Sequence, residues 1–175
     1  MACLNGTVIN KKEWIVVMVN NVVHVSLFSF ALSLSACIND ASADAHAARG
    51  QSALSGQSLR LRDHATLRCL DSNADGKVYA MDCNGGDFQR WNLAWVSYGF
   101  QLRDAATARC LDSNTSGEVY TLPCNGGAFQ QWTFDTDTEG YVIKDVATGR
   151  CLDSNADGKV YAFDCNGGNF QHWLR

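Results

Sequence analysis

Three near-identical segments fill the second half of the chain, and this internal repeat limits the possible folds more than any other feature. Cys69, Cys110 and Cys151 lie at equivalent positions and set a period of 41 residues. Within each segment, short runs rich in Val, Tyr, Phe and Trp alternate with Asp-Gly, Ser-Gly or Gly-Gly pairs, and no window has helical periodicity. Each segment is therefore predicted to form a few short strands connected by turns.

Three such units could stack as a linear solenoid or close around a threefold axis. A solenoid would expose two apolar ends, whereas four-stranded units wrapped around an axis cover one another and need no caps. We therefore predict an all-β fold, a β-trefoil with pseudo-threefold symmetry, over residues 57–175. Its repeats are expected at residues 57–97, 98–138 and 139–175.

Six of the eight cysteines form pairs with a spacing of 14 residues, one pair in each repeat. Metal ligation is the alternative, but it usually needs close Cys-x-x-Cys pairs or accompanying histidines, and none of the four histidines recurs between repeats. Disulfides are therefore predicted, and they require an oxidising compartment. The predicted pairs are Cys69 with Cys83, Cys110 with Cys124, and Cys151 with Cys165.

The N-terminal segment, residues 1–37, has the pattern of an export signal. Two lysines precede a largely apolar run from Trp14 to Ala36, and the four residues that end at Cys37 read Leu-Ser-Ala-Cys. This ending resembles the lipobox of bacterial lipoproteins, in which the cysteine thiol receives a diacylglycerol. The resemblance implies a protein anchored to a bacterial membrane through Cys37, at the outer membrane or cell surface. A simply cleaved signal, which would give a secreted protein, and an uncleaved anchor are the alternatives.

Residues 38–56 are mostly Ala, Ser, Asp and Gly, with almost no large apolar side chains, and this composition is typical of a flexible linker. The formal charge of the whole chain is −4 and no long basic run is present, so the sequence has no electrostatic signature of nucleic-acid binding. We expect a monomer without a metal or cofactor.

A Gln-x-Trp tripeptide near the end of each repeat is predicted to be structural. The tryptophans can fill the core, and the glutamine amides can satisfy backbone groups that an aromatic interior would leave unpaired. The six residues are Gln89, Trp91, Gln130, Trp132, Gln171 and Trp173.

Gln-x-Trp in triplicate, together with a cysteine pair in each repeat, resembles the ricin B-type β-trefoil lectins. The longer string L-D-S-N-x-x-G-x-V-Y-x-x-x-C-N-G-G-x-F-Q-x-W is most similar to the actinohivin-like lectins, a three-repeat group that binds α1,2-linked mannose on high-mannose glycans. The resemblance implies a carbohydrate-binding lectin with up to three shallow pockets for terminal α-mannosides, acting by multivalent avidity on mannose-rich oligosaccharides or glycoproteins.

A hexose pocket needs a carboxylate and an amide for the hydroxyl groups, and an apolar wall for the C–H face of the ring. Each repeat contains an Asp, an Asn and a Tyr that could form such a set, and the resemblance adds two wall positions. The polar candidates are Asp71, Asn84 and Tyr79, Asp112, Asn125 and Tyr120, and Asp153, Asn166 and Tyr161. The wall candidates are Met81, Leu122 and Phe163, followed by Phe88, Phe129 and Phe170.

Two departures bear on specificity. The aromatic before Gln-x-Trp is Phe in all three repeats, where the actinohivin-like lectins have Tyr, and the first wall residue differs in every repeat. Galactose pockets of the ricin type use an aromatic at that wall position and an Asn before the Gln. Phe163 alone meets the first requirement and no residue meets the second, so mannose is favoured and a galactose- or xylan-binding module is the alternative.

Other functional classes have weaker support. Residues 71–82 and 153–164 follow the spacing of an EF-hand calcium loop, but position twelve is Asp, and Ser116 and Pro123 break the pattern in repeat two. No nucleophile motif or phosphate loop is present and no histidine recurs, so an enzyme is not expected. A module that only binds proteins would leave the pocket residues free to vary between repeats, and here they hardly vary.

Overall fold

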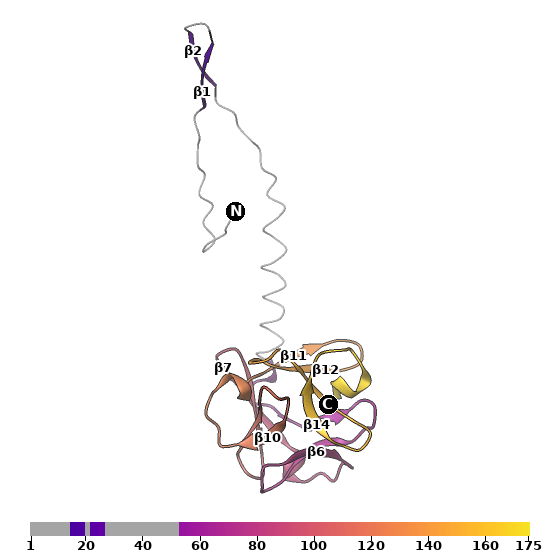
Figure 1. The fold of residues 1–175 in the computed structure, drawn as a ribbon. Coiled ribbons are helices and arrows are strands. Elements are labelled where there is room, and N and C mark those ends of the chain that lie inside the picture. The colour runs from indigo at the N-terminus through magenta and orange to yellow at the C-terminus, as the bar shows by residue number, and fades with distance from the viewer. Residues whose placement is uncertain (1–14, 20–21, 27–52) are drawn as a thin grey trace. The chain divides into compact units, whose positions relative to one another are not determined.

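A computed structural model describes residues 15–19, 22–26 and 53–175 (Figure 1). The predicted lipidation site, Cys37, lies outside these ranges, as do most of the predicted signal segment and most of the predicted linker. Within the described ranges, no helix is long and apolar enough to cross a membrane.

The chain divides into two compact units, residues 1–42 and residues 43–175. In the first unit, β1 (Ile15–Val19) and β2 (Val22–Ser26) pair as antiparallel strands. Val occupies three of the five positions in each strand, and such β-branched residues favour extended backbone.

In the second unit, strands β3 to β15 form one connected sheet in which the same order of elements occurs three times. Repeat one contains β3 (Ser58–Leu59), β4 (Arg62–Asp63), β5 (Cys69–Ser72), β6 (Val78–Met81), the 3-10 helix η2 (Asp87–Gln89) and β7 (Trp91–Val96). Repeat two contains β8 (Gly99–Asp104), β9 (Cys110–Ser113), β10 (Val119–Leu122), η3 (Ala128–Gln130) and β11 (Trp132–Thr136). Repeat three contains β12 (Tyr141–Asp145), β13 (Cys151–Ser154), β14 (Val160–Phe163), η4 (Asn169–Gln171) and β15 (His172–Leu174).

The repeats close into a ring, because each one ends in a strand that pairs with a strand near the start of the next. β7 pairs with β8, β11 with β12, and β15 with β4, all antiparallel. The last of these contacts joins the two ends of the unit and aligns only two residue pairs, Trp173 with Asp63 and Leu174 with Arg62. The predicted all-β trefoil is confirmed.

Three aspartates that the sequence analysis did not single out bind neighbouring repeats together. The Asp104 carboxylate accepts hydrogen bonds at Oδ1 from the backbone N and the Oγ1 of Thr107, at 2.6 and 2.8 Å, and at Oδ2 from Ser72 Oγ of the preceding repeat, at 2.8 Å. The equivalent groups are Asp145 with Thr148 and Ser113, and Asp63 with Thr66 and Ser154. We call Asp63, Asp104 and Asp145 the seam aspartates.

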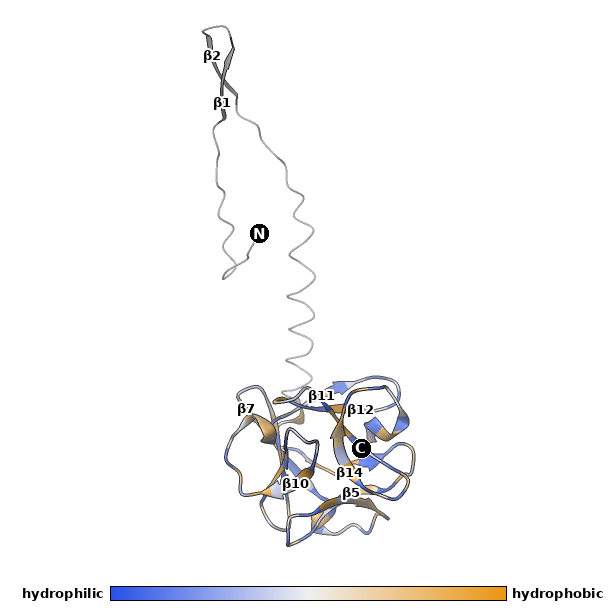
Figure 2. Ribbon diagram, in the orientation of Figure 1, coloured by the Kyte–Doolittle hydropathy of each residue, from blue (hydrophilic) through white to orange (hydrophobic). Residues whose placement is uncertain are grey.

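The core forms where the inward faces of the repeats meet, with hydrophobic residues along the strands (Figure 2). Trp91, Trp132 and Trp173 are fully buried in it. Each indole N–H donates to a backbone carbonyl, as Trp91 Nε1 does to Leu70 O at 3.0 Å. The tryptophans therefore fill the interior without leaving a polar group unpaired.

The three predicted disulfides are confirmed. They join Cys69 to Cys83, Cys110 to Cys124 and Cys151 to Cys165, each with a Cα–Cα distance of 5.1 Å. Each bond ties the start of one hairpin strand to the loop that follows its partner strand. In the chain-entropy picture, closing a loop of this length is worth about 3 kcal/mol.

The domain begins before the predicted boundary at residue 57. Leu54, which was assigned to the linker, is 9% exposed and packs in the hydrophobic cluster. Gly56 N donates to Leu93 O at 2.8 Å, and Gln57 N donates to Leu54 O at 3.1 Å. A single leucine in a small-residue segment was a weak signal, but burying it is favourable and anchors these residues to the domain.

Candidate functional site

Strand alternation places the predicted binding residues of each repeat on one face of a hairpin. In the β5–β6 hairpin, Asp71 is directly opposite Tyr79, and Cys69 is opposite Met81. Because side chains two apart along a strand point to the same side, Asp71, Tyr79 and Met81 share a face. β9–β10 and β13–β14 have the same register.

The glutamine of each Gln-x-Trp tripeptide joins the rest of the site to this face. Gln89 Nε2 donates to Asp71 Oδ2 at 2.7 Å and to Asp82 O at 3.0 Å, while its Oε1 accepts from Asn84 N at 2.8 Å. Gln130 and Gln171 make the same bonds in the other repeats. The glutamine therefore both fixes the orientation of the aspartate and holds the loop that carries the asparagine.

The aspartates of these sites, Asp71, Asp112 and Asp153, are buried, with exposed fractions of 2 to 4%. Among the described residues, no side chain donates a hydrogen bond to their Oδ1 atoms. Burial raises the pKa of each carboxyl above its ordinary value, although the hydrogen bond from the glutamine acts in the opposite direction. We call these three the site aspartates.

The tyrosines are half-buried beside the site aspartates. Tyr79 Oη donates to Ser72 O at 3.3 Å, and Tyr120 and Tyr161 make equivalent bonds at 3.2 Å. Burial raises the pKa of each phenol, and the neighbouring site aspartate raises it further. The rings are thus fixed in place, with the phenol group neutral.

The asparagines are exposed, and half of each amide is already used in a local turn. Asn84 Oδ1 accepts from Gly86 N at 2.8 Å, and Asn125 and Asn166 make the same bond to Gly127 and Gly168. Nδ2 is the part of the amide that this turn does not use, so the asparagine offers a ligand mainly a hydrogen-bond donor.

The predicted wall residues lie at the surface to different extents. Met81, Leu122 and Phe163 are exposed at 38, 43 and 54%. Phe88, Phe129 and Phe170 are half-buried on the 3-10 helices. An exposed apolar side chain therefore accompanies every site aspartate. We call Asp71, Tyr79, Met81, Asn84 and Phe88, with their equivalents in the other repeats, the repeat sites.

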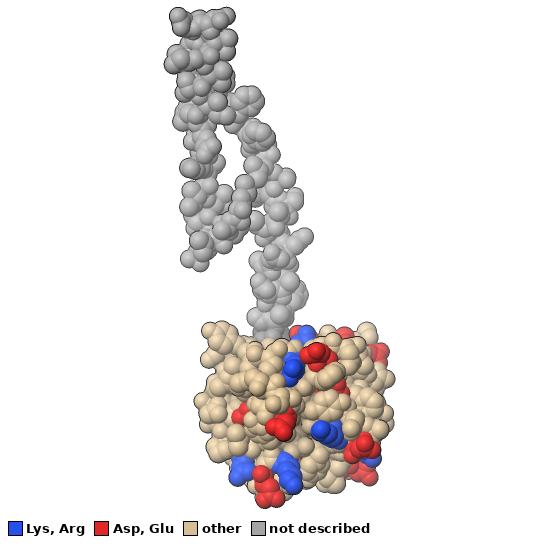
Figure 3. Space-filling view, viewed as in Figure 1, with Lys and Arg blue, Asp and Glu red and all other residues tan. Residues whose placement is uncertain are grey.

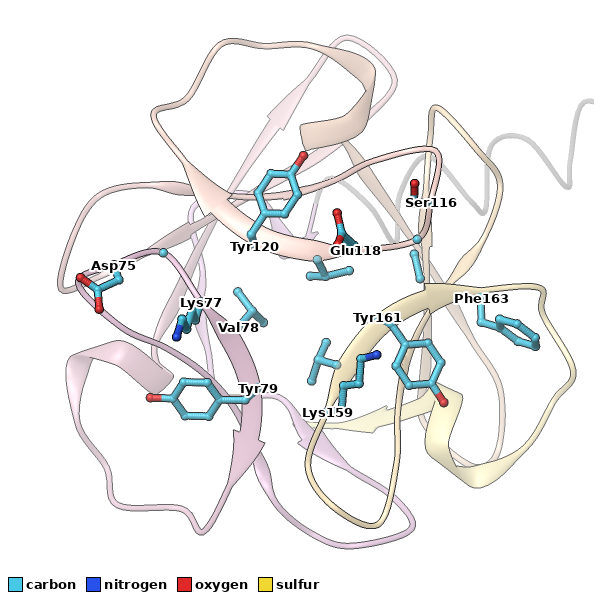
Figure 4. A pocket seen from close by; sticks show the side chains of 15 residues that line it. Asp75, Lys77, Val78, Tyr79, Ser116, Glu118, Tyr120, Lys159, Tyr161 and Phe163 are labelled. Atoms are coloured by element: carbon cyan, nitrogen blue, oxygen red, sulfur yellow. The ribbon is translucent and has the colours of Figure 1, made fainter.

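A hollow lies on the threefold axis, where the three hairpins meet (Figure 4). It has a volume of about 840 Å³, and all three repeats line it with the equivalents of Lys77, Val78 and Tyr79. The wall residue Phe163 of repeat three also lines it, whereas Asp71, Asn84 and Phe88 do not. The tyrosines therefore face this axial depression as well as their own site aspartates. Sequence reasoning missed it. The recurring Gly-x-Val-Tyr string was the available signal.

The calcium alternative does not agree with the geometry. Residues 71–82 form a β-hairpin rather than a loop between two helices, and Asp71, the first position of the EF-hand pattern, is bonded to Gln89. Asn73 Oδ1 accepts from Lys77 N at 2.9 Å. Over residues 53–175, no three His, Cys, Asp or Glu side chains converge in a way that could hold a metal.

The closed ring of three hairpin-bearing repeats defines a β-trefoil, and each repeat presents a carboxylate, an amide and an apolar side chain together. Residues 57–173 match the family described as the ricin-type β-trefoil lectin domain, and the chain belongs to this family. Such domains are carbohydrate-binding modules, so membership implies that the protein binds carbohydrate.

Solved structures with the same fold include natural and designed proteins. The designed threefold-symmetric protein ThreeFoil is 25% identical, with a TM-score of 0.61 over 67% of this chain and 96% of that one. The exo-β-1,3-galactanase 1,3Gal43A from Clostridium thermocellum is 23% identical, with a TM-score of 0.61, and the hemolytic lectin CEL-III is 21% identical, with a TM-score of 0.58. In both, the match covers 67% of this chain but only 29% of the other, so these two show the fold of one part of a longer protein.

Proposed function

We propose that the protein is a lectin for terminal α-mannosides of the high-mannose type, with one shallow site in each repeat. One observation carries the proposal: a buried carboxylate held by glutamine, beside an exposed apolar side chain, occurs three times. The free carboxylate oxygen can accept from a sugar hydroxyl in a charge-assisted bond, and asparagine Nδ2 can donate beside it. The wall residue then covers the C–H face of the ring.

Avidity is the expected source of strength. A single shallow monosaccharide site with a Kd of about 1 mM provides only about −4 kcal/mol. Three sites on one domain can engage several branches of a glycan, which raises the effective affinity without any new contact. Free mannose should therefore bind weakly and branched mannosides tightly.

A galactoside- or xylan-binding module is the second candidate, and one residue favours it. Phe163 is the only aromatic among the three first-wall residues and the most exposed, and its ring makes an edge contact with Tyr161 at 6.2 Å between centroids. An aromatic ring is a good surface for the flat C–H face of a sugar. Phe163→Leu gives repeat three the same wall residue as repeat two, which has Leu122. This variant is expected to lose any preference for galactosides or xylan that the Phe163 ring provides.

The protein is proposed to act outside the cytoplasm, as a monomer. The three disulfides support export, because such bonds persist in oxidising compartments. Attachment to a bacterial membrane through a lipid on Cys37 is part of this proposal, with secretion as the alternative. Mass spectrometry of the purified protein would distinguish them, because lipidation adds a diacylglycerol to an N-terminal Cys37.

A glycan array with the oxidised protein tests the specificity, with and without a chelator. Binding to α1,2-mannosides that resists the chelator, and that is lost in an Asp71→Asn/Asp112→Asn/Asp153→Asn variant, is the expected result. Preferential binding to galactosides or xylan fragments would be consistent with the repeat sites but would contradict the proposed specificity for mannosides. Mannoside binding that persists in the triple variant would show that the repeat sites are not used.

A further inference from the structure

The axial depression is a rigid feature of the fold. Antiparallel bridges connect its three hairpins in a cycle, one of which joins Lys77 to Tyr120. Thr121 N donates to Gly76 O at 2.8 Å. A Cβ on Gly76 would lie only 2.7 Å from Thr121 O, so the two hairpins can approach this closely only because the residue is glycine. The same glycine contact recurs at Gly117 and Gly158. The depression is therefore formed before any ligand arrives.

Its floor and walls offer apolar surface. Val78 lies near its centre, and the rings of Tyr79, Tyr120 and Tyr161 lie around it (Figure 4). The equivalent valines of the other two repeats, Val119 and Val160, also line it. Since the phenol O–H groups donate to backbone carbonyls, each tyrosine offers a ligand its ring face and a phenol oxygen that can still accept a hydrogen bond. Apolar walls with a few polar groups are typical of a small-molecule site.

The charged residues of the depression break the threefold symmetry. Lys77, Glu118 and Lys159 hold equivalent positions in the three repeats. Within residues 53–175, neither lysine ammonium lies within ion-pair distance of a carboxylate, and Lys159 Nζ lies 5.9 Å from the centre of the Tyr161 ring. Glu118 Oε2, in contrast, accepts from Asn114 Nδ2 at 2.7 Å, which holds its carboxylate against its own turn.

The remaining acidic residue of the lining, Asp75, is exposed on the hairpin turn at the edge of the depression. On the face of the domain drawn in Figure 3, basic and acidic side chains are interspersed, with no large patch of one sign. The two ammonium groups are therefore a local feature of the axis rather than part of a broad basic surface.

We propose that the axial depression binds a sugar residue that carries a carboxylate, of the uronate class. Lys77 and Lys159 supply cations for the carboxylate, and the valine floor and tyrosine rings contact the C–H faces of the sugar. A free inorganic anion could use the cations but not the apolar surface. The axial site shares the three tyrosines and Phe163 with the repeat sites but contains no site aspartate, so substitutions of the site aspartates distinguish it from the mannoside proposal.

The repeats themselves supply substitutions that the fold tolerates at this position. Glu118→Lys places in repeat two the residue that repeats one and three already have, and Lys77→Glu with Lys159→Glu does the reverse. Binding of trigalacturonate to the oxidised full chain is measured by titration calorimetry at low salt. Glu118→Lys is expected to tighten binding about threefold to fivefold, and the double Lys→Glu variant to abolish it.

Three controls decide the outcome. Neutral galactotriose should not bind at the axis, sodium sulfate should compete only weakly, and the triple site-aspartate variant should bind trigalacturonate as the wild type does. Absence of trigalacturonate binding, or binding that neither charge reversal changes, would overturn the proposal. Sulfate that binds as tightly as trigalacturonate would overturn it too, since the sugar would then contribute nothing. Trigalacturonate binding that persists in a variant without mannoside binding would support the axial site.

Discussion

The seam aspartates and the site aspartates occur once in every repeat and are nearly equally buried, yet their hydrogen bonding differs. Asp104 uses both oxygens, because Thr107 donates two hydrogen bonds to Oδ1 and Ser72 of the preceding repeat donates one to Oδ2. Asp112 accepts one side-chain hydrogen bond, from Gln130, at Oδ2. Side chains therefore donate to both oxygens of a seam carboxylate but only to Oδ2 of a site carboxylate, which a backbone N–H of the next residue also stabilises. We infer that Oδ1 of a site carboxylate is the oxygen that receives a ligand hydroxyl.

The difference shows how to separate structural from binding residues in a symmetric fold. Repetition alone cannot do so, because every residue that the fold needs is repeated as well. Counting the donors around each carboxylate can, since a buried acceptor is expected to be satisfied unless it has another role.

The largest expected effect is on stability at a seam. Asp104→Ala removes the acceptor of three hydrogen bonds and leaves the hydroxyl of Ser72 buried without its partner. We expect the free energy of unfolding to fall by about 3–4 kcal/mol, measured by urea denaturation of the oxidised protein.

Asp112→Ala is the matched control, because it removes a carboxylate of similar burial that accepts a single side-chain hydrogen bond. Gln130 Nε2 retains Pro123 O as a partner, so the loss of stability should be about 1 kcal/mol or less. Equal losses in the two variants would contradict the assignment of separate roles.

The next largest effect is on binding. Asp112→Asn retains an oxygen that can accept from Gln130 but loses the charge, so the fold should keep its stability while repeat two loses its sugar. A hydrogen bond to a charged group is worth about 1.5–3 kcal/mol, which corresponds to a loss of about tenfold or more at that site. Surface plasmon resonance on immobilised branched mannoside measures it, and unchanged avidity would show that repeat two is not a site.

The pH dependences of stability and binding should run in opposite directions. Burial raises the pKa of the site aspartates in the folded state, so the folded protein holds these protons more tightly than the unfolded chain does. Their contribution to stability is therefore fully present below the ordinary carboxyl pKa and is lost as the pH rises through the raised pKa. Sugar hydroxyls donate to the ionised form, so affinity should instead fall as the pH is lowered through that range.

Subtracting the triple site-aspartate Asn variant isolates this effect, because every other titrating group is shared. The free energy of unfolding of the wild type relative to the variant should decrease from mild acid to neutral pH, by about 1.4 kcal/mol for each unit of pKa shift at each site. A difference that does not change with pH would mean that these carboxyls titrate normally.

The smallest effect is expected for a single donor at a seam. Ser113→Ala removes one hydrogen bond to Asp145 Oδ2, while Thr148 still donates to Oδ1. The expected loss is about 1 kcal/mol in thermal or urea denaturation, without a change in mannoside binding. If mannoside binding changed under conditions in which the variant is fully folded, the seam and the repeat sites would be coupled.

Much of the domain could be predicted from the sequence because its signals are local and repeated. The cysteine spacing predicted the disulfides, and the alternation of aromatic runs with Gly-containing turns predicted the strands. The role of Asp104 could not be predicted, because its partner Ser72 lies 32 residues away in the preceding repeat. Leu54 was assigned to the linker for a similar reason, since its packing partners are distant in sequence.

The sequence by itself determined the repeat, the ring closure, the disulfides and the membership of a carbohydrate-binding class, because period, cysteine spacing and turn residues act over short distances. Only the tertiary structure distinguished the seam aspartates from the site aspartates and revealed the axial depression. Both features depend on atoms that different repeats bring together. The donors around a seam carboxylate and the surface on the axis are assembled only when the ring closes.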